Sequence, residues 1–225
     1  MTCFALVPCA GIGVRAGTDG PKQYVPLAGR PLVAHTLAAL AAVPRLRGTL
    51  VVLAPQDRQF ETLVPAHPAP WVARVGGETR AASVAAGLQA LRSLGAGDDD
   101  WVLVHDAARG LLRPEWVDRL IDACTDDQVG GLLAMPLADT LKQAEAGRVA
   151  ATLDRRDKWL AQTPQMFRLG LLDRALAAAG PDVTDEASAV EALGLAPRLV
   201  EGSAENFKLT WPGDFALAAR LLETR

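Results

Sequence analysis

Short apolar runs of strand length alternate along this chain with segments of helical periodicity, and this alternation constrains the fold more than any other feature. The expected strands are residues 4–7, 49–54, 72–75, 101–105, 132–137 and 198–200. The expected helices are residues 31–42, 57–63, 80–94, 114–124, 170–179, 185–193 and 212–223. Strands that alternate with helices form a mostly parallel, twisted sheet with helices on both faces. We therefore expect an α/β fold, and 225 residues fit one domain, 1–225.

Composition excludes several classes of protein. A formal net charge of −3 argues against nucleic acid or an anionic membrane as the main partner, because both need a basic surface. Cys3, Cys9 and Cys124 are widely spaced, so neither a disulfide framework nor a zinc site is indicated. The chain begins without the basic segment of a signal peptide, and no apolar run is long enough to span a membrane. We expect a soluble cytoplasmic protein.

A glycine-rich segment follows the first expected strand and is typical of a phosphate-binding loop. Gly11, Gly13 and Gly17 let the backbone approach a ligand and turn its N–H groups toward an anion. Arg15 and Lys22 add positive charge. A flexible surface turn with incidental charges is the alternative.

Two commoner signatures resemble this segment. Gly11, Gly13 and Ala16 match the dinucleotide-binding pattern, but the acidic residue expected after the second strand is missing at Ala54-Pro55-Gln56. A P-loop would need Ser or Thr after its lysine, whereas Lys22 is followed by Gln23.

Ligands in such sheets bind beyond the carboxyl ends of the strands, which directs attention to the loops after Val7, Val75, His105 and Leu137. The segment 76–83 joins a glycine pair to a helix whose first turn offers N–H groups and two side-chain hydroxyls, which suits a polar ligand.

The loop after His105 places Asp106 at a strand end, close to Arg109. This carboxylate suits a metal–phosphate site, and a structural ion pair with Arg109 is the alternative. We expect His105 itself to be a packed strand residue rather than a base.

Residues 138–158 depart from the alternation and are expected to form a hairpin, with strands 140–144 and 148–153 and a turn at 145–147. A two-stranded ribbon with so few apolar residues is marginal alone in water. We expect a dimerisation arm that is exchanged with a second subunit across a two-fold axis. The charged run 154–158 would then lie at its base or tip, facing the neighbour's pocket.

Two later segments carry polar residues. Thr184 is expected to cap the helix that follows it, with Asp185 and Glu186 complementing the helix dipole. Lys208 lies in a short segment whose apolar residues alternate.

These segments together resemble one family, the 2-C-methyl-D-erythritol 4-phosphate cytidylyltransferases of non-mevalonate isoprenoid biosynthesis. The matching motifs span nearly the whole chain in order and are P-C-A-G-I-G-V-R, P-K-Q-Y, G-G-E-T-R-A-A-S-V, V-H-D-A-A-R, D-T, L-D-R, T-P-Q-M-F, T-D-E-A-S and N-F-K-L-T. The resemblance implies a Rossmann-like nucleotidyltransferase fold, CTP and methylerythritol phosphate as substrates, pyrophosphate as product, Mg²⁺ as metal and a homodimer with exchanged arms.

The resemblance also implies roles for individual residues. Arg15 and Lys22 would stabilise the transition state, whereas Arg155 and Lys208 would hold the methylerythritol phosphate. Asp106 would bind the metal, with Ala107 beside the ribose. The remaining residues implied in substrate binding are Pro8, Cys9, Ala10, Gly11, Gly13, Gly76, Gly77, Glu78, Arg80, Ser83, Arg109, Thr140, Thr163 and Thr184.

Three alternatives are weighed against this function. A ribitol 5-phosphate cytidylyltransferase would share the CTP-binding half, although Thr140, Arg155, Thr184 and Lys208 favour methylerythritol phosphate. A nucleotide-binding module without turnover would not need the Arg15–Lys22 pair. An NAD-binding domain would need the missing acidic residue. No second domain follows the matched segments, so we expect no fusion with a later enzyme of the pathway.

Overall fold

The computed structural model of this chain describes residues 1–11, 20–64, 70–180 and 183–224. A seven-stranded sheet forms its centre, in the order β11-β7-β10-β6-β1-β4-β5. Its strands are β1 (Cys3–Pro8), β4 (Leu46–Val52), β5 (Trp71–Ala73), β6 (Trp101–Val104), β7 (Gly130–Pro136), β10 (Trp159–Arg168) and β11 (Arg198–Glu201). Four neighbouring pairs are parallel, β1–β4, β1–β6, β4–β5 and β7–β11. The mostly parallel sheet expected from the sequence is confirmed.

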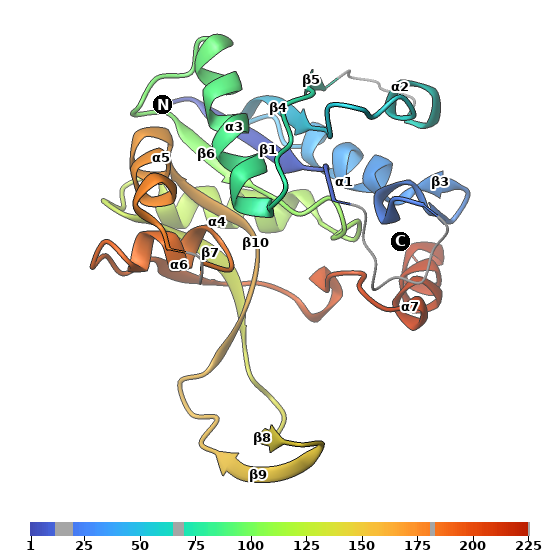
Figure 1. Ribbon diagram of the computed structural model, residues 1–225, viewed down its shortest axis with the longest axis vertical. Helices are drawn as coiled ribbons and strands as arrows, with labels where there is room; N and C mark the ends of the chain where they lie inside the picture. The colour runs from blue at the N-terminus through green and yellow to red at the C-terminus, as the bar shows by residue number, and fades with distance from the viewer. Residues whose placement is uncertain (12–19, 65–69, 181–182, 225) are drawn as a thin grey trace.

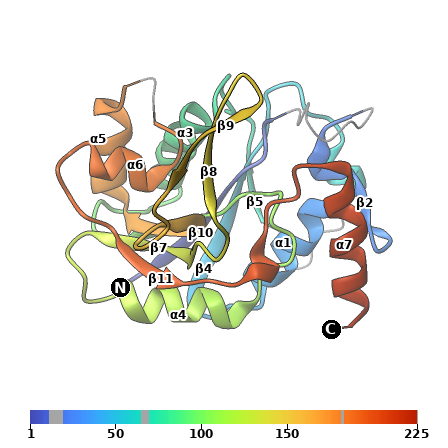
Figure 2. The same cartoon turned by 90° about the horizontal axis from the view of Figure 1, so that it is seen from below.

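Helices cover both faces of the sheet (Figures 1 and 2). They are α1 (Leu32–Ala41), α2 (Phe60–Leu63), α3 (Arg80–Ser93), α4 (Pro114–Cys124), α5 (Leu169–Ala178), α6 (Glu186–Glu191) and α7 (Pro212–Glu223). One buried cluster joins the sheet to α1 and α4 through Val33 and Trp116, and another joins it to α3 and α5 through Leu88 and Leu172. A third, smaller cluster packs Ala218 of α7 against Leu27 and Leu209.

The strand β10 was not expected from the sequence. It runs antiparallel between β6 and β7, and its register against β7 shifts between Ala161 and Gln165. Pro164 and the buried polar side chains Gln162 and Thr163 lie at this shift. A proline in a strand is confined to edges and irregularities of the sheet, so the sequence pattern argued against a central strand here.

The helix expected at 57–63 is also shorter than expected. Asp57 accepts hydrogen bonds from the backbone N–H groups of Gln59 (2.9 Å) and Phe60 (3.1 Å). This Asx-type turn occupies the first expected residues, and α2 begins only at Phe60.

The expected hairpin is present and protrudes from the body of the molecule (Figure 1). It consists of β8 (Leu141–Glu145) and β9 (Arg148–Leu153), which pair antiparallel. Ala146 and Gly147 between them have φ angles of 48° and 75°, as a tight two-residue hairpin turn with the sheet's twist requires. Val149 is 65% exposed and Leu160, beyond the hairpin, is 52% exposed.

A few smaller features of the described residues remain. β2 (Pro26–Leu27) and β3 (Arg30–Pro31) form a short ribbon before α1. Cys3, Cys9 and Cys124 are buried and free, as expected. Among the described residues, no helix combines the length and the apolar character that crossing a bilayer would take.

Candidate active site

A cavity of about 670 Å³ opens at the edge of the sheet where the parallel strands β1, β4, β5 and β6 end. The described residues that line it are Pro8, Cys9, Ala10, Gly11, Lys22, Gln23, Ala54, Pro55, Gln56, Gly76, Gly77, Glu78, Thr79, Arg80, Ser83, Asp106, Ala107, Ala108 and Lys208. The loops after β1, β5 and β6 thus contribute as expected. The loop after β4 lines the cavity too, whereas the described lining does not include the expected loop after β7.

Two of the lining loops touch each other closely. A Cβ atom on Gly76 would lie 2.3 Å from the Cβ of Ala10 and 2.7 Å from the carbonyl oxygen of Leu53. Gly76 also donates its N–H to that carbonyl, at 2.8 Å. Only glycine fits this position, which brings the backbone of both loops to one side of the cavity.

The start of α3 is fixed by the two hydroxyls that we expected to face a ligand. Thr79 caps the helix by accepting from the N–H of Ala82, at 3.0 Å. Ser83 accepts from the N–H of Gly77 at 3.1 Å and donates to the carbonyl of Thr79 at 3.0 Å. The hydroxyl of Ser83 therefore holds the glycine turn in place, and that of Thr79 fixes the start of the helix.

The short turn Lys22–Tyr24 links three parts of the cavity wall. Lys22 Nζ donates to the carbonyl of Leu209 (2.7 Å), and the amide of Gln23 donates to the carbonyl of Cys9 (3.0 Å). Tyr24 donates to Asp57 (2.6 Å). Gln23 was not a candidate from the sequence, although it lies in the motif P-K-Q-Y, because its contact with Cys9 depends on how two loops meet.

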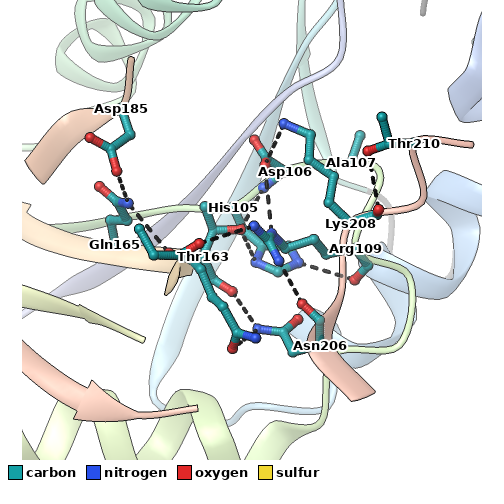
Figure 3. Close-up of polar contacts among 12 residues, drawn as sticks. His105, Asp106, Ala107, Arg109, Thr163, Gln165, Asp185, Asn206, Lys208 and Thr210 are labelled. Atoms are coloured by element: carbon teal, nitrogen blue, oxygen red, sulfur yellow. Dashed lines mark hydrogen bonds and ion pairs between the residues drawn. The ribbon is translucent and has the colours of Figure 1, made fainter. Parts of the chain in front are cut away.

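Lys208 reaches the cavity because its neighbour is anchored. Leu209 is fully buried against α7, and its N–H donates to the carbonyl of Ala108 at 2.9 Å. Because successive side chains of an extended segment point to opposite sides, Lys208 points away from the buried face of Leu209 and toward Asp106. Its Nζ lies 2.9 Å from Asp106 Oδ2 (Figure 3).

Asp106 is buried among cations. Besides Lys208, Arg80 Nε donates to Oδ1 at 2.9 Å and Arg109 Nε lies 3.6 Å from Oδ2. Burial opposes ionisation of this carboxyl, but the charges of Arg80, Lys208 and Arg109 outweigh it and hold its pKa well below the usual range. The ion pair with Arg109, expected as one alternative, is confirmed. Among the residues that the structure describes, no three His, Cys, Asp or Glu side chains gather as a metal site.

His105 and Thr163 lie next to Asp106 (Figure 3). Thr163 Oγ1 accepts from the N–H of Asp106 and lies 3.0 Å from His105 Nδ1. Burial lowers the pKa of His105 to about 4. His105 is packed, as expected, and Thr163 holds the strand end that carries Asp106.

The other candidate residues occupy different places. Arg109 donates to the carbonyl of Asn206 (2.6 Å). Thr184 borders a separate cavity of about 240 Å³, and Thr140 and Arg155 are exposed near the base of the arm. Gly13 and Arg15 lie outside the described residues.

The helix α6 differs from the expectation. Its N-cap is Asp185 rather than Thr184, since Asp185 accepts from the N–H of Ser188 in a capping box. Glu186 lies in the first turn, where an acid complements the helix dipole as expected, and it is also buried and bonded to Arg80. The sequence could not indicate this pair, which joins segments far apart in the chain.

Comparisons with known proteins show the family of this chain. Residues 3–224 match the family model of IspD, 2-C-methyl-D-erythritol 4-phosphate cytidylyltransferase. The chain belongs to this family. It is 57% identical to the 2-C-methyl-D-erythritol 4-phosphate cytidylyltransferase of Chromobacterium violaceum, over 99% of this chain and 98% of that protein.

Two further similarities extend the comparison. The chain is 63% identical to the bifunctional enzyme IspD/IspF of Albidiferax ferrireducens, over 99% of this chain and 53% of that protein, so it spans about half of that relative's length. A crystal structure of a 4-diphosphocytidyl-2C-methyl-D-erythritol synthase superposes with a TM-score of 0.88, at 43% identity and 98% coverage of both chains. The family expected from the motifs is confirmed.

Proposed function

We propose that this chain transfers the cytidylyl group of CTP to 2-C-methyl-D-erythritol 4-phosphate and releases pyrophosphate. One observation carries the proposal. In a single cavity, the backbone of Pro8–Gly11 and Gly76–Gly77 lies together with the cations Lys22, Arg80 and Lys208. Glycine-rich backbone and fixed positive charge are what a triphosphate and a second phosphate need in order to approach each other.

The reaction needs positioning and charge stabilisation rather than a covalent nucleophile. A phosphate oxygen of the polyol phosphate attacks the α-phosphorus of CTP, a new P–O bond forms, and the bond to the bridging oxygen of the departing pyrophosphate breaks. Lys22 and Arg15 stabilise the charge that develops in the transition state. Lys208 and Arg155 hold the attacking phosphate.

The remaining candidate residues divide between the two substrates. Residues 8–13 and 76–83 hold CTP, with Asp106 and Ala107 beside its ribose. Arg109, Thr140 and Thr184 contribute to the site of the polyol phosphate, whereas Thr163 contributes to the CTP side through the strand end that carries Asp106.

Mg²⁺ fits this site as an ion that arrives with the triphosphate. Magnesium is usually bound by one or two carboxylates together with substrate phosphates and water, and Asp106 offers an ionised carboxylate in the cavity wall. Arg80 donates to Oδ1 and Lys208 lies against Oδ2, so these two cations would share the carboxylate with the metal or compete with it. Bound there, the ion would neutralise part of the triphosphate charge.

The proposed assembly is a cytoplasmic homodimer. Each subunit consists of one nucleotidyltransferase domain, residues 1–225, in which residues 138–158 form a dimerisation arm. The arm carries exposed apolar side chains at Val149 and Leu153, and Trp159 and Leu160 continue this character at its base. A second copy of the same arm would bury them.

Pyrophosphate release tests the proposed reaction. Purified protein is incubated with CTP, Mg²⁺ and either methylerythritol phosphate or ribitol 5-phosphate, and ATP replaces CTP in a parallel series. We expect release only with CTP and methylerythritol phosphate together. Faster turnover of ribitol 5-phosphate would assign the second substrate to the rival class, and CTP binding without release would indicate a binding module.

A further inference from the structure

Glu186 is a buried acid that the proposed chemistry does not use. It is the first residue of the six-residue helix α6 and has no exposed surface. Its two carboxylate oxygens accept from Arg80 Nη1 at 2.6 Å and Arg80 Nη2 at 2.9 Å. This bidentate contact fixes the orientation of the guanidinium as well as pairing its charge.

Arg80 is thereby held between two carboxylates. Its terminal nitrogens face Glu186, and its Nε donates to Asp106 Oδ1 at 2.9 Å. Arg80 also lines the cavity. Glu186 therefore fixes one end of a guanidinium whose other edge touches the central acid of the site.

The position of Glu186 is set from the sheet. Gln165 on β10 accepts from the N–H of Ala187 at 2.7 Å and donates to Asp185 Oδ2 at 2.8 Å. Gln165 is itself buried. Hydrogen bonds thus fix the first turn of α6 to a central strand. Glu186 therefore has little freedom to follow Arg80 if the arginine moves.

The charge balance gives this arrangement a consequence for anion binding. The cations Arg80, Arg109 and Lys208 face the acids Asp106 and Glu186. Without Glu186, Arg80 would keep Asp106 as its carboxylate partner. Its guanidinium could then rotate, so that its terminal nitrogens would face either an incoming phosphate or the carboxylate of Asp106. With Glu186, its orientation is fixed before any ligand arrives, and a preorganised group loses less entropy on binding.

We propose that Glu186 is a positioning residue for CTP binding, which acts by holding the Arg80 guanidinium in the cavity wall. This inference rests on the proposed function. Glu186 is not among the described residues that line the cavity, but it is bonded to Arg80, which is, so its effect has to pass through Arg80.

Direct CTP binding tests the inference without turnover. The dissociation constant for CTP is measured by calorimetry, with Mg²⁺ and without polyol phosphate, for Glu186→Gln, Arg80→Ala and the double variant. Glu191→Gln is the matched control, because it makes the same change at an exposed position of the same helix. Near-UV circular dichroism verifies that each variant is folded. If Glu186→Gln does not fold, Glu186→Asp, which keeps the charge but withdraws it by one methylene group, takes its place.

We expect Glu186→Gln to weaken CTP binding by about tenfold, the scale of a hydrogen bond to a charged group, and Glu191→Gln to leave it unchanged. In the Arg80→Ala background, Glu186→Gln should have no further effect. CTP affinity at the wild-type level in folded Glu186→Gln, or an equal loss with and without Arg80, would overturn the inference. A wild-type protein that releases no pyrophosphate and binds no CTP would overturn the proposed function and the inference with it.

Discussion

His105 has no exposed surface, and both of its ring nitrogens lie near protein oxygens. The carbonyl of Arg109 beside Nε2 can only accept a hydrogen bond, so a neutral ring that bonds at both nitrogens accepts from the hydroxyl of Thr163 at Nδ1. His105 Nε2 then carries the proton and donates to the carbonyl of Arg109, at 3.3 Å. A neutral imidazole thus holds both ends of the loop that bears Asp106.

This environment predicts a pH dependence of stability. Burial lowers the pKa of His105 to about 4 in the folded protein. Its unfolded value is near 6.5, so below that pH the unfolded chain binds the extra proton and the folded protein does not. Stability is therefore lost as the pH falls from 6.5 toward 4, by about 2 kcal/mol between pH 7.5 and pH 5 for this group.

Urea unfolding of the wild type and His105→Asn at those two pH values measures this contribution. Asparagine places an amide oxygen near the Nδ1 position and cannot be protonated in this range. The loss of stability on acidification should be smaller in the variant by about the same 2 kcal/mol. Equal losses in both proteins would mean that His105 does not titrate as its burial implies.

Single residues were predictable from the sequence where their chemistry is local. Asp106 stands at a strand end beside Arg109, and both features are visible in the motif V-H-D-A-A-R. The contacts of Asp106 with Arg80 and Lys208 were not visible, because they depend on how three distant loops meet at one edge of the sheet.

Elements were predictable where periodicity agreed with burial, and α4 and β1 match their expected ranges closely. β10 was missed for a physical reason. Its buried polar residues Gln162, Thr163 and Gln165 are paired with other parts of the fold, such as the carbonyl of Ser203 and the carboxylate of Asp185. Their polarity in the sequence therefore looked like that of a loop.

The helix α6 depends on its cap more than a longer helix would. Its six residues form fewer than two turns, so few hydrogen bonds within the helix stabilise it. Asp185→Ala removes the acceptor of the Ser188 N–H and leaves the amide of Gln165 without this partner. We expect a loss of about 1 kcal/mol in the free energy of unfolding, the usual cost of an N-cap. Urea midpoints measure it, with Glu191→Gln as the exposed control on the same helix. Identical midpoints for the two variants would argue against the capping role.

At the scale of the whole molecule, the hairpin stands apart, because its strands are not part of the central sheet. The strands β8 and β9 form a sheet of their own. Val149 and Leu153 are 65% and 41% exposed. The sequence predicted this arm from its poor apolar content, and the proposal that it is exchanged between subunits leads to a test.

The exchange requires that Arg155 serves the active site of the other subunit. Lys22→Ala and Arg155→Ala should each be nearly inactive, because we propose that Lys22 stabilises the transition state and that Arg155 holds the attacking phosphate. The two variants are unfolded, mixed in equal amounts and refolded, so that subunits pair at random. Each mixed dimer then contains one site with both lesions and one site with neither, since an intact Lys22 meets an intact Arg155 of the partner subunit.

Random pairing makes half of the dimers mixed, so about a quarter of all sites should regain activity. If Arg155 serves its own subunit, every site keeps one lesion and mixing restores nothing. Refolding each variant alone is the control for recovery by refolding itself, and native mass spectrometry establishes that mixed dimers have formed. Mixed dimers without recovered activity would refute the exchange of arms, while the chemistry proposed for the cavity, which depends on Lys22 and Lys208 of one subunit, would still stand.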